Sequence, residues 1–151
     1  MSGDPRQTPA HQAIHATAVA MRGGGVLIQG PSGSGKSELA LRLIERGATL
    51  IGDDYVHVFA SGGALYAAPP VRLQGLLEVR GVGLARLCFR REGRLVLVAD
   101  LVPGETIERM PKLGYKLLRG IWLPVVRVAP QTHAAPAKIE QALRLLGDAR
   151  Q

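Results

Sequence analysis

Apolar residues recur along this chain with two different spacings, and the change of spacing separates predicted strands from a predicted helix. Short apolar runs predict strands at residues 17–21, 26–28 and 49–51. Between the last two, apolar residues at helical spacing alternate with charged ones, which predicts an amphipathic helix. Its apolar face consists of Leu39, Ala40, Leu43 and Ile44. Gly47 follows where a helix would end in a left-handed residue.

The middle of the chain alternates apolar and polar residues about glycine turns, which predicts hairpins. Residues 56–60 and 65–68 form the first predicted hairpin, and residues 86–90 and 95–101 form the second. Two hairpins exclude an all-parallel sheet of alternating strands and helices. We therefore expect a mixed α/β domain.

The last third of the chain predicts less regular structure. Residues 103–120 are irregular in pattern, with some helix, and residues 121–128 contain Pro124, which is typical of an edge strand. A final helix is expected to start near Pro136, because proline is tolerated in the first turn, and to end by Gly147.

The composition is that of a globular protein with one core. The chain has 151 residues, 46% hydrophobic and 21% charged. We predict a flexible tail at residues 1–10 and a single domain at residues 11–151. Because no apolar run approaches about 20 residues and the N-terminus lacks a signal pattern, we expect a cytoplasmic protein without a membrane span. Cys88, between Leu87 and Phe89, is expected to be a buried structural thiol.

The chain is strongly basic, with a net charge of +7. Such a charge suits a polyanionic ligand or an acidic partner, and nucleic acid is one candidate. Aromatic residues make up only 4% of the chain, and the lysines and arginines of its second half are spread singly or in pairs. A base-stacking platform is therefore lacking, and we expect no nucleic-acid partner.

A glycine-rich segment joins the strand at 26–28 to the predicted helix and matches the phosphate-loop pattern Gly-x-x-x-x-Gly-Lys-[Ser/Thr]. It reads Gly30, Pro31, Ser32, Gly33, Ser34, Gly35, Lys36 and Ser37. Glycines let backbone N–H groups close around phosphate oxygens, Lys36 can reach the terminal phosphates, and Ser37 offers a hydroxyl to Mg²⁺. A Gly/Ser-rich turn that happens to contain lysine is the alternative, and the strand–loop–helix setting favours the phosphate site.

Two acidic strand ends could serve this loop. Asp53-Asp54 follows the strand at 49–51, and Asp100 ends the apolar run at 95–101. By pattern alone, the position of Asp100 is that of an ordinary metal-binding acid at the end of a strand. The paired carboxylates of Asp53-Asp54 could instead take two roles, one binding the metal and the other accepting a proton. Paired acids also occur as simple turn residues. Because they follow the loop closely, we favour a functional role for them.

Two further features are open to a functional and a structural interpretation. His15 lies on a strand that could pair beside the loop, although a histidine there is more often structural or exposed. In residues 77–83, Glu78 and Arg80 face one side of an extended segment before two glycines. This segment is either a surface strand with an ion pair or a loop that brings the Glu78 carboxylate to a metal.

Taken in order, these elements resemble the HPr kinase/phosphorylase family. The resemblance rests on His15, the phosphate loop at 30–37, Asp53-Asp54, and residues 77–83, which read Leu-Glu-Val-Arg-Gly-Val-Gly, close to the family signature Leu-Glu-Ile-Arg-Gly-Leu-Gly. It implies a mixed central sheet like the nucleotide-binding fold of phosphoenolpyruvate carboxykinase. It also implies transfer of the γ-phosphoryl group of ATP to a serine of HPr, the small phosphocarrier of the bacterial phosphotransferase system.

The resemblance assigns roles to individual residues. It implies that the loop at 30–37 binds the nucleotide phosphates and that Ser37, Glu78 and Asp53 hold or adjoin Mg²⁺. Asp54 would accept the serine proton. His15, Lys36 and Arg109 would complete the catalytic set, with Arg109 in a more divergent context, and the oligomer would be a hexamer.

The chain departs from the family pattern in two places. Only 14 residues precede His15, so we expect the N-terminal domain of full-length members to be absent. Residues 123–130 lack the Pro-Gly-Arg-Asn part of a late family segment linked to dephosphorylation. We therefore expect a kinase with weak or no phosphorolysis. A phosphate-loop kinase for a small metabolite and a non-catalytic nucleotide sensor are the alternatives, and the intact acid pair favours a catalyst.

Overall fold

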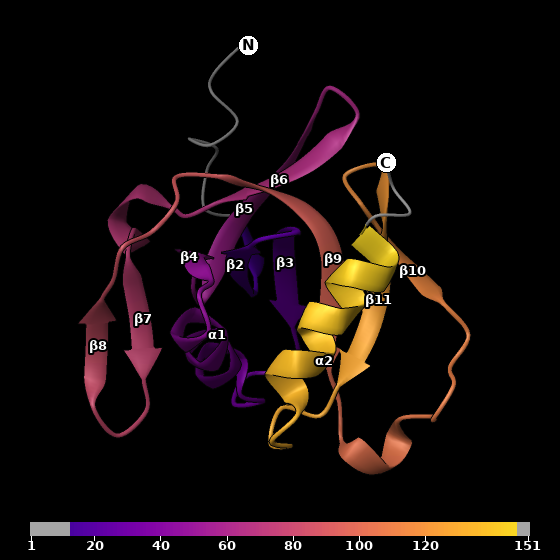
Figure 1. Cartoon of the computed structure of the whole chain (residues 1–151). Coiled ribbons are helices and arrows are strands. Elements are labelled where there is room, and N and C mark those ends of the chain that lie inside the picture. The colour runs from indigo at the N-terminus through magenta and orange to yellow at the C-terminus, as the bar shows by residue number, and fades with distance from the viewer. Residues whose placement is uncertain (1–12, 148–151) are drawn as a thin grey trace.

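The computed structural model describes residues 13–147, and in this range the chain folds around one mixed sheet (Figure 1). The predicted tail at 1–10 lies outside the described residues. The strands of the large sheet are β1 (Ala13–His15), β2 (Thr17–Met21), β3 (Gly24–Gln29), β4 (Thr49–Gly52), β5 (Tyr55–Ser61), β6 (Ala64–Ala68), β9 (Gly93–Leu101), β10 (Gly114–Leu118) and β11 (Ile121–Val128).

The order of the strands brings three parallel strand ends to one edge of the sheet. The order is β1-β5-β6-β9-β3-β2-β4. β11 also pairs with β9, along the later residues of that strand, past the point where β9 pairs with β6. β9 pairs in parallel with both β3 and β11, while its first residues pair antiparallel with β6. The prediction of a mixed α/β fold is confirmed. The carboxyl ends of β3, β9 and β11 meet where the phosphate loop begins.

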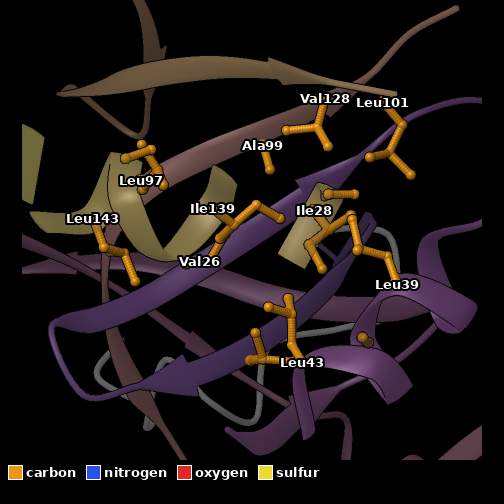
Figure 2. Close-up of a cluster of buried hydrophobic side chains, with 14 of the residues drawn as sticks. Val26, Ile28, Leu39, Leu43, Leu97, Ala99, Leu101, Val128, Ile139 and Leu143 are labelled. Carbon is orange, nitrogen blue, oxygen red and sulfur yellow. The ribbon is translucent and has the colours of Figure 1, made fainter. Parts of the chain in front are cut away.

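Helices α1 (Lys36–Glu45) and α2 (Ala135–Ala142) cover one face of the sheet, and the π-helix η5 (Leu143–Gly147) continues α2. Figure 2 shows side chains of β3, β9 and β11 pointing toward both helices, with Val26, Ile28 and Ile139 at the centre of this core. The opposite face carries a second cluster composed almost wholly of strand residues, including Leu27 and Val98. The sheet therefore curls to bury this face against itself.

A separate hairpin stands beside α1, formed by β7 (Leu76–Val79) and β8 (Gly83–Arg86) (Figure 1). Its turn is closed by a hydrogen bond from Val82 N to Val79 O at 2.9 Å. Gly81 and Gly83 have φ of 84° and 131°, which L-residues with a Cβ rarely adopt. Two 3₁₀ turns, η3 (Val71–Leu73) and η4 (Gly104–Thr106), are the remaining helical elements of the described residues.

The structure corrects several expectations about strand pairing. The predicted hairpin of 86–90 with 95–101 is wrong, because β8 pairs with β7 and β9 lies in the middle of the large sheet. The predicted edge strand is also wrong: β11 lies between β9 and β10, and Pro124 is paired with Tyr115. Residues 114–118, expected to be irregular, form the edge strand β10.

Cys88 is exposed, which overturns the prediction of a buried thiol. Leu87 and Phe89 pack against the core beneath the helices, and in an extended segment the residue between two inward side chains points outward. In the described part of the chain, no helix is long and apolar enough to cross a membrane.

Candidate active site

The phosphate loop links the end of β3 to the start of α1, and its glycines are required by geometry. A Cβ on Gly30 would lie 2.6 Å from Ser34 Oγ and 3.1 Å from Leu101 Cβ, which leaves no room for a side chain. Gly33 and Gly35 have φ of 80° and 101°, in the left-handed region. Gly35 also precedes α1 directly, and Leu39 N donates to its carbonyl at 2.9 Å. The N-terminal N–H groups of α1 therefore face the loop.

Lys36 is held over the loop by the loop's own carbonyl groups. Its Nζ donates to Gly30 O at 2.8 Å and to Pro31 O at 3.0 Å, and the residue is only 7% exposed. An ammonium group has three N–H donors, so one remains for a phosphate oxygen. Ser34 Oγ is buried and has no hydrogen-bond partner among residues 13–147. The free ammonium donor, beside the N-terminal N–H groups of α1, fits a bound anion.

Asp53 connects the first turn of α1 to the sheet. Its carboxylate accepts hydrogen bonds from Ser37 Oγ, at 2.7 Å to Oδ1 and 3.0 Å to Oδ2, and from Thr17 Oγ1 at 2.8 Å. The backbone N–H of Glu78 donates to Oδ2 at 3.1 Å. Asp53 is 5% exposed, so this buried charge is stabilised by three donor groups from three elements.

Asp54 points the other way, toward the open part of the site. Its φ of 70° is unusual for a residue with a side chain, and its side chain is 64% exposed. Nε2 of His15 lies 3.2 Å from Asp54 Oδ1, and the His15 ring packs on Tyr55 with the centroids 5.2 Å apart. The strained backbone turns the two adjacent carboxylates apart, so that one is buried and the other is accessible.

A cavity of about 200 Å³ lies between the loop, the Asp53-Asp54 corner and the β7–β8 hairpin. The predicted residues that line it are His15, Ser32, Gly33, Gly35, Lys36, Ser37, Asp53, Asp54 and Glu78. Gly30, Pro31 and Ser34 belong to the loop but do not line the cavity. His15 reaches it from β1, which pairs with β5. The structure thus brings most of the predicted set together.

Two acidic or basic residues that the sequence suggested for the site, Arg109 and Asp100, do not line this cavity. Arg109 is exposed on the segment between η4 and β10 and does not line the cavity, so its catalytic role stays a prediction. Asp100, the other candidate acid, does not line the cavity either, although β9 is the immediate neighbour of β3.

Three lining residues were not predicted: Thr17, Glu38 and Arg80. Thr17 is fully buried at the start of β2, and a hydroxyl at the start of an otherwise apolar strand was the signal available for it. Arg80 was noted only as a neighbour of Glu78. Lys36 and Arg80 are the lysine and arginine residues of this lining.

The donor set fits a hard divalent cation such as Mg²⁺. Ser37 offers a hydroxyl, and Asp53 and Glu78 offer carboxylates, which are the oxygen ligands that Mg²⁺ prefers. Residues 13–147 contain no group of three or more His, Cys, Asp and Glu side chains placed to hold a metal. A site of this kind, with few protein ligands, is typical of Mg²⁺ bound together with nucleotide phosphates.

The sequence and the fold were compared with those of known proteins. The family model described as HPr Serine kinase C-terminal domain matches residues 6–110. The HPr kinase/phosphorylase of Verminephrobacter eiseniae is 40% identical over 132 residues, which cover 80% of this chain and 42% of that protein. The HPr kinase/phosphorylase of Streptococcus thermophilus is 36% identical over 138 residues, covering 83% of this chain and 45% of that protein.

The fold gives the same result. The structure of the Hpr(Ser) kinase/phosphatase from Coxiella burnetii matches with a TM-score of 0.79 and 27% identity, over 89% of this chain and 95% of that one. The chain spans less than half the length of the curated relatives named above. On the family model, the sequence identity and the fold together, this chain belongs to the family of HPr serine kinase C-terminal domains.

Proposed function

We propose that this chain is the catalytic domain of an ATP-dependent serine kinase whose substrate is the phosphocarrier protein HPr. The proposal extends to this chain the activity named for its relatives. One observation carries it: the phosphate loop is bonded through Ser37 to Asp53, and the adjacent Asp54 is exposed in the same cavity. A site that only sensed a nucleotide would have no use for this second, accessible carboxylate.

The residues divide the reaction between binding and proton transfer. The loop and Lys36 hold the nucleotide phosphates and stabilise the charge that develops on the transferred group. The serine oxygen attacks the γ-phosphorus, its proton passes to an oxygen of Asp54, and the bond to the leaving ADP oxygen breaks. His15 positions Asp54 through the contact at 3.2 Å. Mg²⁺, held by Ser37 and Glu78 with Asp53 adjoining, would neutralise phosphate charge when bound.

Three parts of the proposal come from the family resemblance. Arg109 would add a positive charge to the catalytic set, which requires its segment to approach the cavity. The assembly would be a hexamer. Phosphorolysis would be weak or absent because residues 123–130 lack the Pro-Gly-Arg-Asn motif. Incubation of serine-phosphorylated HPr with excess inorganic phosphate tests the last point, and rapid release of pyrophosphate would contradict it.

The main experiment is a transfer assay with γ-labelled ATP and Mg²⁺. HPr and a panel of small metabolites bearing hydroxyl groups are offered to the protein in parallel. Label on a serine of HPr supports the proposal, and label on a metabolite alone would replace it with a metabolite kinase. Nucleotide binding without any transfer would indicate the sensing module. Lys36→Met is the matched control, because it removes the loop charge and should abolish transfer to any acceptor.

A further inference from the structure

A second cavity lies at the opposite end of α1 from the phosphate loop. Its volume is about 600 Å³, against about 200 Å³ for the candidate active site. Its walls come from the β2–β3 turn, from the end of α1 and the residues after it, and from α2 with η5. α1 has 10 residues and so is about 15 Å long. A group bound here is therefore not the phosphate held by the loop.

The rim of this cavity, which we term the arginine cavity, carries Arg22, Arg46 and Arg144 against one carboxylate, Glu140. Arg46 already binds that carboxylate through two hydrogen bonds, Nε to Oε2 at 3.0 Å and Nη2 to Oε1 at 2.5 Å. These hydrogen bonds are the main reason that the pKa of Glu140 lies below its ordinary value, and the charge of Arg144 lowers it further. The acid is therefore ionised and paired at neutral pH.

Two positive charges remain at the rim after this pairing. Within residues 13–147, neither Arg22 nor Arg144 makes a hydrogen bond or ion pair through its side chain. Both are exposed residues, so their guanidinium groups can turn toward a ligand without breaking a hydrogen bond or ion pair. A guanidinium group presents a planar pair of N–H donors that matches a carboxylate or phosphate.

The floor of the arginine cavity is apolar. Met21 and Ala48 line it and are partly exposed, whereas Leu43 and Leu143 also line it but are 1% and 5% exposed, since they belong to the core beneath the helices. Gly47 has φ of 111°, and a Cβ there would meet no atom within 4 Å. The hollow thus offers room for carbon atoms between an apolar floor and a cationic rim. Inorganic ions would use only the rim.

We propose that the arginine cavity binds a small organic dianion, with Arg22 and Arg144 bonded to its charged oxygens and its carbon skeleton over Met21 and Ala48. Phosphate monoesters and dicarboxylates share this chemistry. Binding at this end of α1 is separate from phosphotransfer, because none of these residues lines the candidate active site.

Calorimetric titration of the nucleotide-free protein with phenyl phosphate and with phthalate tests the proposal, and the double variant described next separates binding in the arginine cavity from binding at the phosphate loop. We expect saturable binding of at least one probe. The double variant Arg22→Ala/Arg144→Ala should weaken it by about tenfold or more, because charge-assisted hydrogen bonds are lost. The matched control Arg90→Ala/Arg91→Ala removes the same charge from exposed positions outside the cavity and should bind as the wild type does.

The probes also identify the kind of ligand. Binding of phenyl phosphate alone assigns the cavity to phosphate monoesters, and binding of phthalate alone assigns it to dicarboxylates. Inorganic phosphate should bind more weakly than phenyl phosphate, since it leaves the apolar floor uncovered. The proposal is overturned if neither probe saturates, if the double variant binds as the wild type does, or if the control loses as much affinity. Thermal unfolding of each variant confirms that it is folded.

Discussion

Two strand ends carry acids near the phosphate loop, and only one of them reaches the cavity. Asp100 lies at the end of β9, opposite Gln29 in the parallel register with β3, one residue before the loop. Asp53 and Asp54 follow β4, which is separated from β3 by β2. Along the sheet, Asp100 is the closer neighbour of the loop, yet Asp53 and Asp54 line the cavity.

The direction of α1 explains this difference. α1 leaves the loop and packs against β2, β4 and the β7–β8 hairpin, whereas α2 and η5 cover β11 and β9 (Figure 1). The first turn of α1 therefore brings Ser37 to the β4 side, where it donates to Asp53. Thr17, at the start of the intervening β2, donates to the same carboxylate and closes the gap between the two strands.

Side-chain alternation removes Asp100 from the same site. Ala99 and Leu101 belong to the core beneath the helices and Val98 to the core on the other face, so Asp100 falls on the face away from α1. Arg127 is its cross-strand neighbour there, and Lys116 Nζ donates to nearby Gln29 Oε1 at 2.6 Å. An acidic residue at the end of an apolar strand is thus a candidate for the active site only under two conditions. Its side chain must lie on the face of the sheet that α1 covers, and its strand must lie on the side of β3 toward which α1 runs.

The largest expected effect comes from Asp54→Asn. An amide cannot accept the serine proton, so kcat for HPr phosphorylation should fall by a factor of about 10²–10⁴. Nucleotide affinity should stay close to that of the wild type, because Asp54 makes no contact with the loop in the structure. Rates of label transfer and calorimetric titration with ADP measure the two quantities. Full retained activity would remove Asp54 from its proposed role.

Asp53→Asn should act on stability as well as on activity. The carboxylate accepts from Ser37, Thr17 and the backbone of Glu78, and an amide can turn an acceptor toward only part of this set. We expect the free energy of unfolding to fall by about 1–3 kcal/mol, the cost of leaving a buried donor unsatisfied. Denaturant unfolding at neutral pH measures it. An unchanged midpoint would show that the network does not hold the β4 end to α1.

His15→Phe should have an intermediate effect on kcat. The phenyl ring can keep the packing on Tyr55 but has no N–H group for the Asp54 carboxylate, so the proton acceptor loses the contact with His15 Nε2. A fall in kcat of about tenfold, with unchanged stability, would reflect poorer placement of Asp54. His15→Gln restores a donor and should recover part of the rate. A loss shared equally by both variants would argue against positioning through this contact.

Local sequence patterns predicted the strands, loop and helix that position the site. They could not predict which strands pair with one another, because that depends on contacts between residues far apart in the sequence. The helix after the loop and the strands before it follow from apolar spacing, and glycines with Lys36 and Ser37 define the loop. Nothing in residues 86–101 identifies the partner of β9, because strand alternation is the same whichever strand lies beside it. The sequence therefore favoured Asp53 and Asp54 only because they follow the loop closely, and the topology supplied the physical reason, which is the side of the sheet that α1 covers.

The smallest expected effect comes from Asp100→Asn, which is the matched control for Asp53→Asn. Both changes replace a strand-end carboxylate near the loop by an amide of the same shape. Asp100 is partly exposed, and no hydrogen bond to its side chain is formed within the described residues, so the free energy of unfolding should change by no more than about 0.5 kcal/mol. Phosphorylation of HPr should stay within about twofold of the wild type. If Asp100→Asn instead lowered kcat as far as Asp53→Asn, the acid nearer along the sheet would serve the reaction after all, and the direction of α1 would not be what selects the catalytic carboxylates.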